Sequence, residues 1–160
     1  MSYTKNEYPS QYIPTEFDNY HTKLMVDGKE IDIDLVDTSG KDEDKLRSLS
    51  FNNCHIFMLM FAVNQRDSFI NCKVKWLKEI TKTAPGTPFI LIGTKSDIKS
   101  NVTGVPKTEI DKFVSETELC TEYKETSAKT QDGVKEAFES AVRTVLYPNN
   151  RGDGGCCIIL

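Results

Sequence analysis

The 160-residue sequence has no long hydrophobic run and no cluster of basic residues. Its longest apolar stretch, residues 56–63, is far too short to cross a bilayer as a helix. Lys and Arg number 20 against 24 Asp and Glu, and the resulting net charge of −4 argues against a nucleic-acid partner. A basic segment followed by an apolar one is also missing, so no signal peptide is expected.

The five cysteines follow no recognised spacing. They stand at positions 54, 72, 120, 156 and 157, which fits neither a zinc site nor a disulfide framework. An odd number of cysteines without a signal peptide indicates a reducing compartment. Cys54, Cys72 and Cys120 are therefore expected to be small, partly buried hydrophobic residues.

Composition and periodicity predict one globular domain over residues 1–148, followed by a flexible tail over 149–160. Alternating residues at 21–26 and 30–36 flank Asp27-Gly28, a pair typical of a two-residue hairpin turn. Further strands are expected at 54–63, 88–93 and 122–126, and helices at 67–83, 107–116 and 132–146. Strands that alternate with helices predict an α/β fold with a mostly parallel sheet.

Polar motifs follow three of the predicted strands. They read DTSG at 37–40, GTKSD at 93–97 and TSAK at 126–129. In α/β sheets ligands bind at the carboxyl ends of strands, and these ends meet at one edge. The three motifs together therefore predict a ligand site at that edge, which one motif alone would not support.

The order of the motifs resembles that of the small GTPases of the Ras superfamily. YIPTEFDNY at 12–20 is followed by DTSG, then GTKSD, then ETSAK at 125–129. The form of the first motif, TKSD, and Trp76 in KVKW are similar to the Rho/Rac branch. The resemblance runs from about Ser2 to Tyr147 and includes the C-terminus. It implies a P-loop NTPase-like fold and a switch between GTP and GDP that uses Mg²⁺.

The resemblance assigns the guanine base to two loops. Asp97 would accept hydrogen bonds from the ring N1–H and the exocyclic amine, a donor pair that adenine lacks. Lys95 would lay its alkyl stem over the purine, and Thr94 would tie the base loops together. The remaining base contacts would come from Ser127, Ala128, Lys129 and Tyr8, with the Ala128 N–H meeting guanine O6.

The same resemblance assigns the phosphate side to two switch segments. Thr15 would ligate Mg²⁺ and donate its N–H to the γ-phosphate, and Asp37 would hold the ion through water. Gly40 would donate its N–H to the γ-phosphate, and both segments would be released on hydrolysis. The effector face would consist of Phe17, Asp18 and Tyr20, although ordinary packing is an alternative for the two aromatic residues.

The C-terminal residues 157–160 read CIIL and form a C-a-a-X box. A terminal Leu favours geranylgeranylation of Cys157. A single lipid usually needs a second signal, and Cys156 is the candidate for palmitoylation because the tail has no polybasic run. The resemblance thus implies residence on the cytoplasmic face of membranes and in the cytosol. It also implies effectors, exchange factors, GTPase-activating proteins and a dissociation inhibitor as partners.

The chain departs from the family at its N-terminus. The phosphate loop G-x-x-x-x-G-K-[ST] occurs nowhere in the 160 residues, and Ser2–Asn6 resembles the end of the helix that follows it. About 20 residues are therefore expected to be missing, and nucleotide affinity is expected to be weak. The family's first strand lies between the strands at 30–36 and 54–63. We expect a marginally stable sheet, or one closed by a pairing foreign to the family.

Two further departures from the family concern GTP hydrolysis and the assignment to the Rho/Rac branch. Lys41 replaces the glutamine that orients the attacking water, and a protonated Lys can donate but not accept. No intact catalytic residue remains, and slow hydrolysis is expected. The segment between Gly40 and Leu46 looks one residue short of the Rho/Rac form. The segment between Asp97 and Ser127 looks too short for the extra helix of Rho proteins.

Three hypotheses stay open on these residues. In the first, the chain is a Rho-type switch and these 160 residues lack its true N-terminus. Alternatively, it is a lipidated interaction module that no longer binds nucleotide and competes for effectors or exchange factors. The third hypothesis is a non-functional, unstable fragment from a duplicated gene.

Overall fold

The computed structural model describes residues 17–38, 40, 45–98, 104–148 and 156–159. Strands β1 (Phe17–Val26) and β2 (Lys29–Thr38) form an antiparallel pair. The turn between them has positive φ at both central residues, 51° at Asp27 and 79° at Gly28. Such a turn matches the twist of the flanking strands, so the predicted hairpin is confirmed and is longer than expected.

The remaining elements follow the predicted order of strands and helices. The strands are β3 (Ile56–Ala62), β4 (Phe89–Thr94), β5 (Cys120–Glu125) and β6 (Cys156–Ile159). The helices are α2 (Lys45–Ser50), η1 (Phe51–Asn53), α3 (Arg66–Asn71), η2 (Cys72–Trp76), α4 (Leu77–Thr83), α5 (Lys107–Glu116) and α6 (Val134–Leu146). The sheet order is β1-β2-β6-β3-β4-β5, and every neighbouring pair except β1–β2 is parallel. The predicted α/β fold is confirmed.

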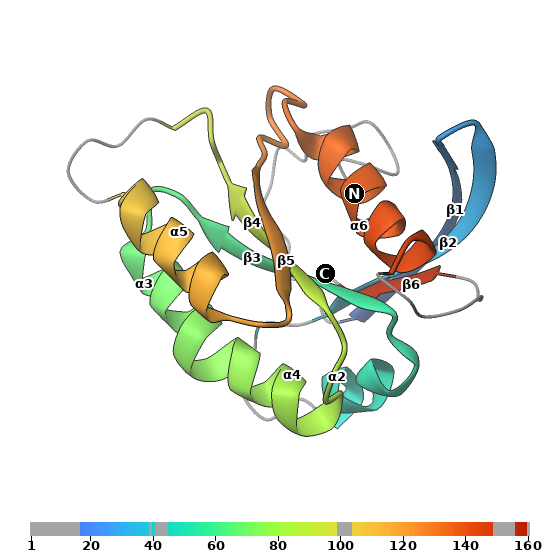
Figure 1. The fold of residues 1–160 in the computed structure, drawn as a ribbon, viewed down its shortest axis with the longest axis horizontal. Coiled ribbons are helices and arrows are strands. Elements are labelled where there is room, and N and C mark those ends of the chain that lie inside the picture. Colours follow the sequence, from blue (N-terminus) through green and yellow to red (C-terminus); the bar gives the residue numbers. More distant parts are fainter. Residues whose placement is uncertain (1–16, 39, 41–44, 99–103, 149–155, 160) are drawn as a thin grey trace.

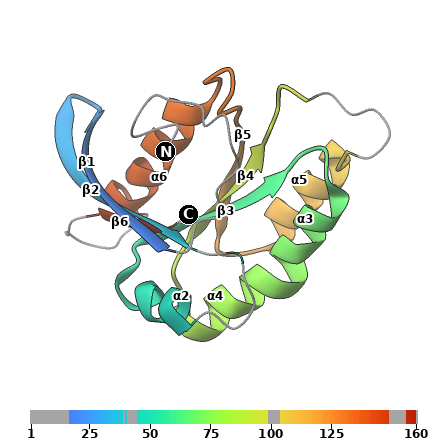
Figure 2. The same ribbon diagram turned by 180° about the vertical axis from the view of Figure 1, so that it is seen from behind.

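Helices cover the two faces of the sheet and enclose two hydrophobic cores. Figure 1 shows α6 on one side and α3, α4 and α5 on the other, and Figure 2 shows the same layers from behind. The core under α6 includes Phe138, Val142 and Ile158. The core on the opposite face centres on aromatic residues, with Phe69 and Phe113 packed edge to face. None of the described helices is long and apolar enough to cross a membrane.

One predicted helix, 67–83, contains an irregular turn. The segment Cys72–Trp76 between α3 and α4 is a π-helix, which widens the helix locally. The Cys72 thiol lies at this turn and contacts the Met60 carbonyl at 3.3 Å. Cys72 and Cys120 are buried and Cys54 is half-buried, as expected for small hydrophobic residues. Burial raises the pKa of Cys72 to about 12 and that of Cys120 to about 11.

The C-terminal segment differs from the expectation. A flexible tail was predicted over 149–160, but Cys156–Ile159 forms β6, between β2 and β3. This is the place where the family's first strand was expected, and the sheet is closed by the chain's own C-terminal segment. The prediction failed because CCII is too short to register as a core strand, although its residues favour extended structure. Residues 149–155 lie outside the described residues.

Candidate functional site

The end of β4 is locked against its neighbours. Thr94 donates its hydroxyl to the Phe61 carbonyl at 3.0 Å, and its own carbonyl accepts from the Val63 N–H at 3.0 Å. At Gly93 an added Cβ would lie 2.3 Å from the Tyr123 hydroxyl and 2.7 Å from a methyl group of Val63, so these two side chains fill the space that a side chain there would need. Lys95 then takes a left-handed conformation with φ of 60°, which turns the chain out of the sheet.

The end of β5 is tied to the same loop. The Thr126 N–H donates to the Gly93 carbonyl at 2.8 Å, and the Ser96 N–H donates to the Thr126 carbonyl at 3.1 Å. Thr126 and Ser127 are both buried although both are polar. The two motifs predicted to form the base site are therefore held together by backbone hydrogen bonds that do not depend on a ligand.

Asp97 is positioned by a buried serine. The Ser127 hydroxyl donates to Asp97 Oδ1 at 2.6 Å, and Ser127 itself is fully buried. The same oxygen of Ser127 accepts from the Thr130 N–H at 3.1 Å, which keeps the hydroxyl proton directed at the carboxylate. A charge-assisted bond of this length is stronger than a neutral one and holds the Asp97 carboxylate in one orientation.

A cavity of about 500 Å³ opens beside this carboxylate. Its mouth is polar, with Thr94, Lys95, Asp97, Ala128 and Lys129 along it. Its floor is apolar and comes from β3, β4 and α6, with Met58, Met60, Ile92, Val134, Ala137 and Phe138 as lining residues. An apolar cleft with a few fixed polar groups is the usual form of a small-molecule site. A flat heteroaromatic ring with a donor edge fits this combination.

The structure brings the residues at the polar mouth together, as the prediction of a base site requires, and sequence reasoning did not name the residues of the floor. The helix at 132–146 was predicted from its 3.6-residue period, which gives it one apolar face. The period cannot show that part of this face borders a cavity instead of packed side chains. Met60 on β3 is 37% exposed, whereas strand residues on a covered face are normally buried. This exposure marks the cavity, and only the structure reveals it.

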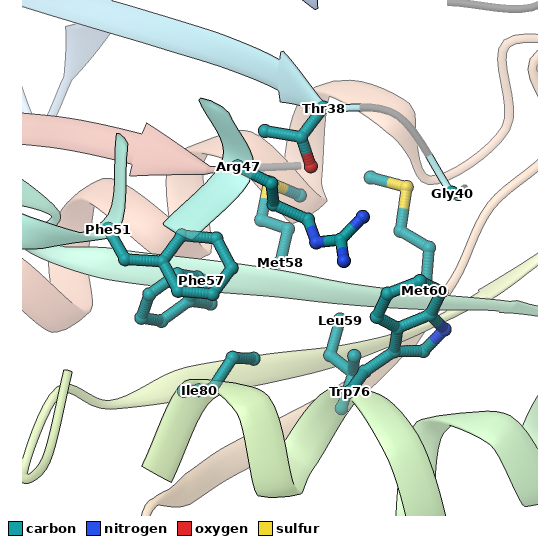
Figure 3. A pocket seen from close by; sticks show the side chains of 10 residues that line it. All are labelled: Thr38, Gly40, Arg47, Phe51, Phe57, Met58, Leu59, Met60, Trp76 and Ile80. Carbon is teal, nitrogen blue, oxygen red and sulfur yellow. The ribbon is translucent and has the colours of Figure 1, made fainter. Parts of the chain in front are cut away.

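A smaller cavity of about 160 Å³ lies at the end of β2, and Figure 3 shows the residues that line it. Arg47 directs its guanidinium into this region, 4.9 Å from the centre of the Trp76 ring. The guanidinium also forms two parallel bonds to Glu79, with Nε–Oε1 at 2.7 Å and Nη2–Oε2 at 3.0 Å. Arg47 is only 4% exposed, so the ion pair is shielded from solvent on its side. The pair joins α2 to α4 beside Thr38 and Gly40. Sequence reasoning missed this pair, because its partners are 32 positions apart.

Comparison with known protein families finds a match that covers most of the chain. The profile of the Ras family matches residues 1–147. The chain belongs to the Ras family. Its members are small GTPases that act as molecular switches and bind GTP or GDP with Mg²⁺. The match confirms the resemblance at the level of the superfamily.

The phosphate side of the Ras-family site is described in part. Asp37 is half-buried at the end of β2, and Gly40 follows in an exposed position. A Cβ added at Gly40 would meet no atom of the described residues within 4 Å, so their packing does not itself demand glycine. Tyr8, Thr15 and Lys41 lie outside the described residues. Within the described part of the chain, no group of three or more His, Cys, Asp and Glu could hold a metal ion.

The predicted effector residues lie on the outer strand β1. Phe17 is 37% exposed at its start. Tyr20 is half-buried against the core under α6, and its hydroxyl donates to Asp18 Oδ2 at 2.9 Å. This hydrogen bond to a carboxylate raises the pKa of Tyr20. Tyr20 therefore has a packing role in addition to any contact with a partner.

Proposed function

We propose that the protein is a Rho-type guanine-nucleotide switch that selects guanine through Asp97. The form of residues 12–20, TKSD at 94–97 and KVKW at 73–76 support the Rho branch. GTP and GDP are the proposed ligands and Mg²⁺ the proposed ion, with Thr15 and, through water, Asp37 holding it. Its partners would be Rho-type effectors, exchange factors, GTPase-activating proteins and a dissociation inhibitor.

The observation that carries this proposal is the 2.6 Å bond from Ser127 to Asp97. A carboxylate held at the mouth of an apolar cleft can accept from both the N1–H and the exocyclic amine of guanine. Adenine offers no such pair and would leave the carboxylate unsatisfied, which disfavours its binding strongly. The stem of Lys95 would cover the ring, and the Ala128 N–H would meet O6.

We further propose that these 160 residues bind nucleotide weakly and hydrolyse it slowly. They contain no G-x-x-x-x-G-K-[ST] loop to hold the phosphates, so the base cavity would supply most of the affinity. Lys41 stands where the family has its water-orienting glutamine, and a Lys⁺ can only donate. Replacing Lys41 with Gln should raise the rate of single-turnover GTP hydrolysis.

A second candidate function is a lipidated interaction module that works without nucleotide. It is favoured by Lys41 and by the described state of β1, which presents Phe17 and Asp18 on a strand paired along its full length with β2. In this case the protein would compete for effectors or exchange factors. Attachment would come from a geranylgeranyl group at Cys157, with Cys156 as a further acylation site.

A change of base specificity tests the first function. The substitution Asp97→Asn places an amide donor where the carboxylate had an acceptor. It should therefore disfavour guanine and favour xanthine, whose C2 carries a carbonyl. We expect the ratio of GDP to xanthosine diphosphate affinity to fall at least about 10²-fold. Asp132→Asn is a matched control, because Asp132 accepts from Thr130 and is exposed next to the same loop.

The outcomes separate the two functions. Titration with fluorescent GDP and Mg²⁺ measures the starting affinity of the unchanged chain. Measurable binding that reverses its base preference in Asp97→Asn, and not in Asp132→Asn, supports the switch. No binding of any purine nucleotide at millimolar concentration would favour the interaction module. Sub-micromolar binding would contradict the proposal that the site is weak.

A further inference from the structure

We propose that Cys156–Ile159 is an exchangeable strand, which completes the sheet when it is seated and presents the C-a-a-X box when it is released. Seated and lipid-modified states would then exclude one another. This inference rests on the proposed lipid attachment at Cys157. It assigns a regulatory role to a segment that would otherwise serve only as an anchor.

The seat of this strand lies between two parallel neighbours. β6 is paired with β2 over Ile33–Val36, with Cys157 in register with Asp34 and Ile158 with Leu35. On its other side Ile158 is in register with Ile56. Ile158 is fully buried in the core under α6, so the seated strand contributes to the packing of the domain and does not lie on its surface.

A prenyltransferase must bind the last residues of its substrate in its own active site. There the thiolate sulfur of Cys157 would attack C1 of geranylgeranyl diphosphate. A C–S thioether bond would form, the C–O bond to the leaving group would break, and diphosphate and the thiol proton would be released. A segment that pairs with strands on both of its sides cannot occupy that active site, so β6 must leave the sheet first.

The pairing of β6 is suited to exchange because it is short. β4 pairs with β3 from Phe57 to Ala62, whereas β6 pairs with β3 at Ile56 and Phe57. Beyond that point the slot continues as the 160 Å³ cavity beside Met58, Met60 and Thr38. The strand therefore fills the start of a longer slot. Its four residues are in register with four residues of β2 but with only two of β3, so its hold on β3 is the weaker one.

The test compares lipid attachment to the intact chain with attachment to a peptide of residues 149–160. Both are incubated with geranylgeranyl diphosphate and a type I geranylgeranyltransferase, and thioether formation is followed by mass spectrometry. We expect the intact chain to react at least about tenfold more slowly, because only its released fraction is a substrate. Equal rates for chain and peptide would contradict the claim that the seated strand cannot be modified. An unreactive peptide would contradict the proposed lipid attachment at Cys157, on which this inference rests.

A pair of matched variants loosens the seat without changing the tail. Ile56 and Ile90 are both fully buried in the core under α6, but only Ile56 is in register with β6. Ile56→Val should increase the modification rate of the intact chain by about twofold to tenfold, and Ile90→Val should leave it nearly unchanged. Equal acceleration by both variants would indicate general destabilisation and would contradict an exchange of β6.

Amide hydrogen exchange measures whether β6 is paired with its neighbours, and it does not depend on the rate of the enzyme. After modification of Cys157, peptides that cover residues 33–36 should exchange at least about tenfold faster, because β6 no longer pairs with them. The Phe57 amide should stay protected, because it donates to the Pro88 carbonyl and not to β6. Peptides from β4 and β5 should keep their protection. Unchanged protection at 33–36 in the modified protein would show that a lipidated strand stays seated, and would overturn the inference.

Discussion

The two ends of the sheet are stabilised in different ways. At β3-β4-β5 the strands come from consecutive parts of the chain, and backbone bonds such as Thr126 N–H to Gly93 carbonyl join their loops. At β1-β2-β6 a hairpin is connected to the other described strands through the C-terminal strand. The proposed base side of the site is therefore assembled by hydrogen bonds between the loops that follow β4 and β5. The phosphate side depends on a segment more than a hundred residues away in sequence, and its order should respond to whatever happens to that segment.

The largest effect is expected at the ion pair that supports the phosphate side. Arg47→Ala would leave the Glu79 carboxylate without its bidentate partner and remove the contact with Trp76. Breaking a buried pair costs about 3–5 kcal/mol, and we expect about 3 because Glu79 keeps 21% of its side chain exposed. Urea unfolding measures this change in the free energy of unfolding.

A double variant serves as the control for this pair. Arg47→Met with Glu79→Leu removes both charges and retains apolar volume, so it should recover most of the loss. If the double variant is as unstable as Arg47→Ala, the loss comes from packing against Trp76 and not from an unpaired charge.

The next effect probes the base side. Gly133 has φ of 68°, and a Cβ there would lie 2.2 Å from the Glu125 carbonyl oxygen. Gly133→Ala combines the cost of a left-handed residue with a clash against backbone, and we expect a loss of about 2–4 kcal/mol. Gly86→Ala is the control, because Gly86 has φ of 83° but open space around its Cβ position. Equal losses in thermal or urea unfolding would contradict a close approach of α6 to β5.

The sequence predicted the two ends of the sheet unequally. The alternation around Asp27-Gly28 and the apolar runs of β3 and β4 are local signals, so these elements were predicted to within a few residues. The pairing of β6 joins residues 33–36 to 156–159. It depends on a gap between β2 and β3 that exists only in the folded sheet. No local pattern carries that information, and the same holds for the Arg47–Glu79 pair.

The site shows the same division. The residues at the polar mouth were predicted from the motifs TKSD and SAK and their order along the chain. The fully buried position of Ser127 and the left-handed Lys95 explain how that chemistry is oriented, and neither follows from residue type. The apolar floor was missed because burial against a cavity and burial against a side chain leave the same periodic pattern.

A pH-dependent effect is expected in the core opposite α6. Burial raises the pKa of Cys72 to about 12 from an ordinary value of 9.0. Above pH 9 the unfolded chain releases this proton while the folded chain retains it, so stability is lost as the pH rises from 9 towards 12. The contribution of Cys72 to this loss should reach about 2–3 kcal/mol by pH 11, and Cys72→Ala should remove that part. The raised pKa of Cys120 causes a separate loss that the variant retains.

The control for this titration is a buried residue that has no proton to lose. Val142→Ala also truncates a fully buried side chain, so it should lower the free energy of unfolding by a similar amount at every pH. Urea unfolding at pH 7.5, 9 and 10.5 distinguishes the two cases. Parallel curves for the wild-type chain and Cys72→Ala would show that another group controls alkaline unfolding.

The smallest effect on stability should have the clearest effect on the site. Ser127→Ala removes the donor to Asp97 and the acceptor of the Thr130 N–H, and we expect a loss of about 1–2 kcal/mol. Because the carboxylate would no longer be held in one orientation, guanine nucleotide affinity should fall by about tenfold while the fold persists. Ser127→Thr keeps the hydroxyl but adds a methyl group in a fully buried position, so it separates the hydrogen bond from the packing. Unchanged affinity in Ser127→Ala would mean that the backbone bonds between the loops after β4 and β5 are sufficient to orient Asp97. The base side would then need no side-chain hydrogen bond to hold its carboxylate.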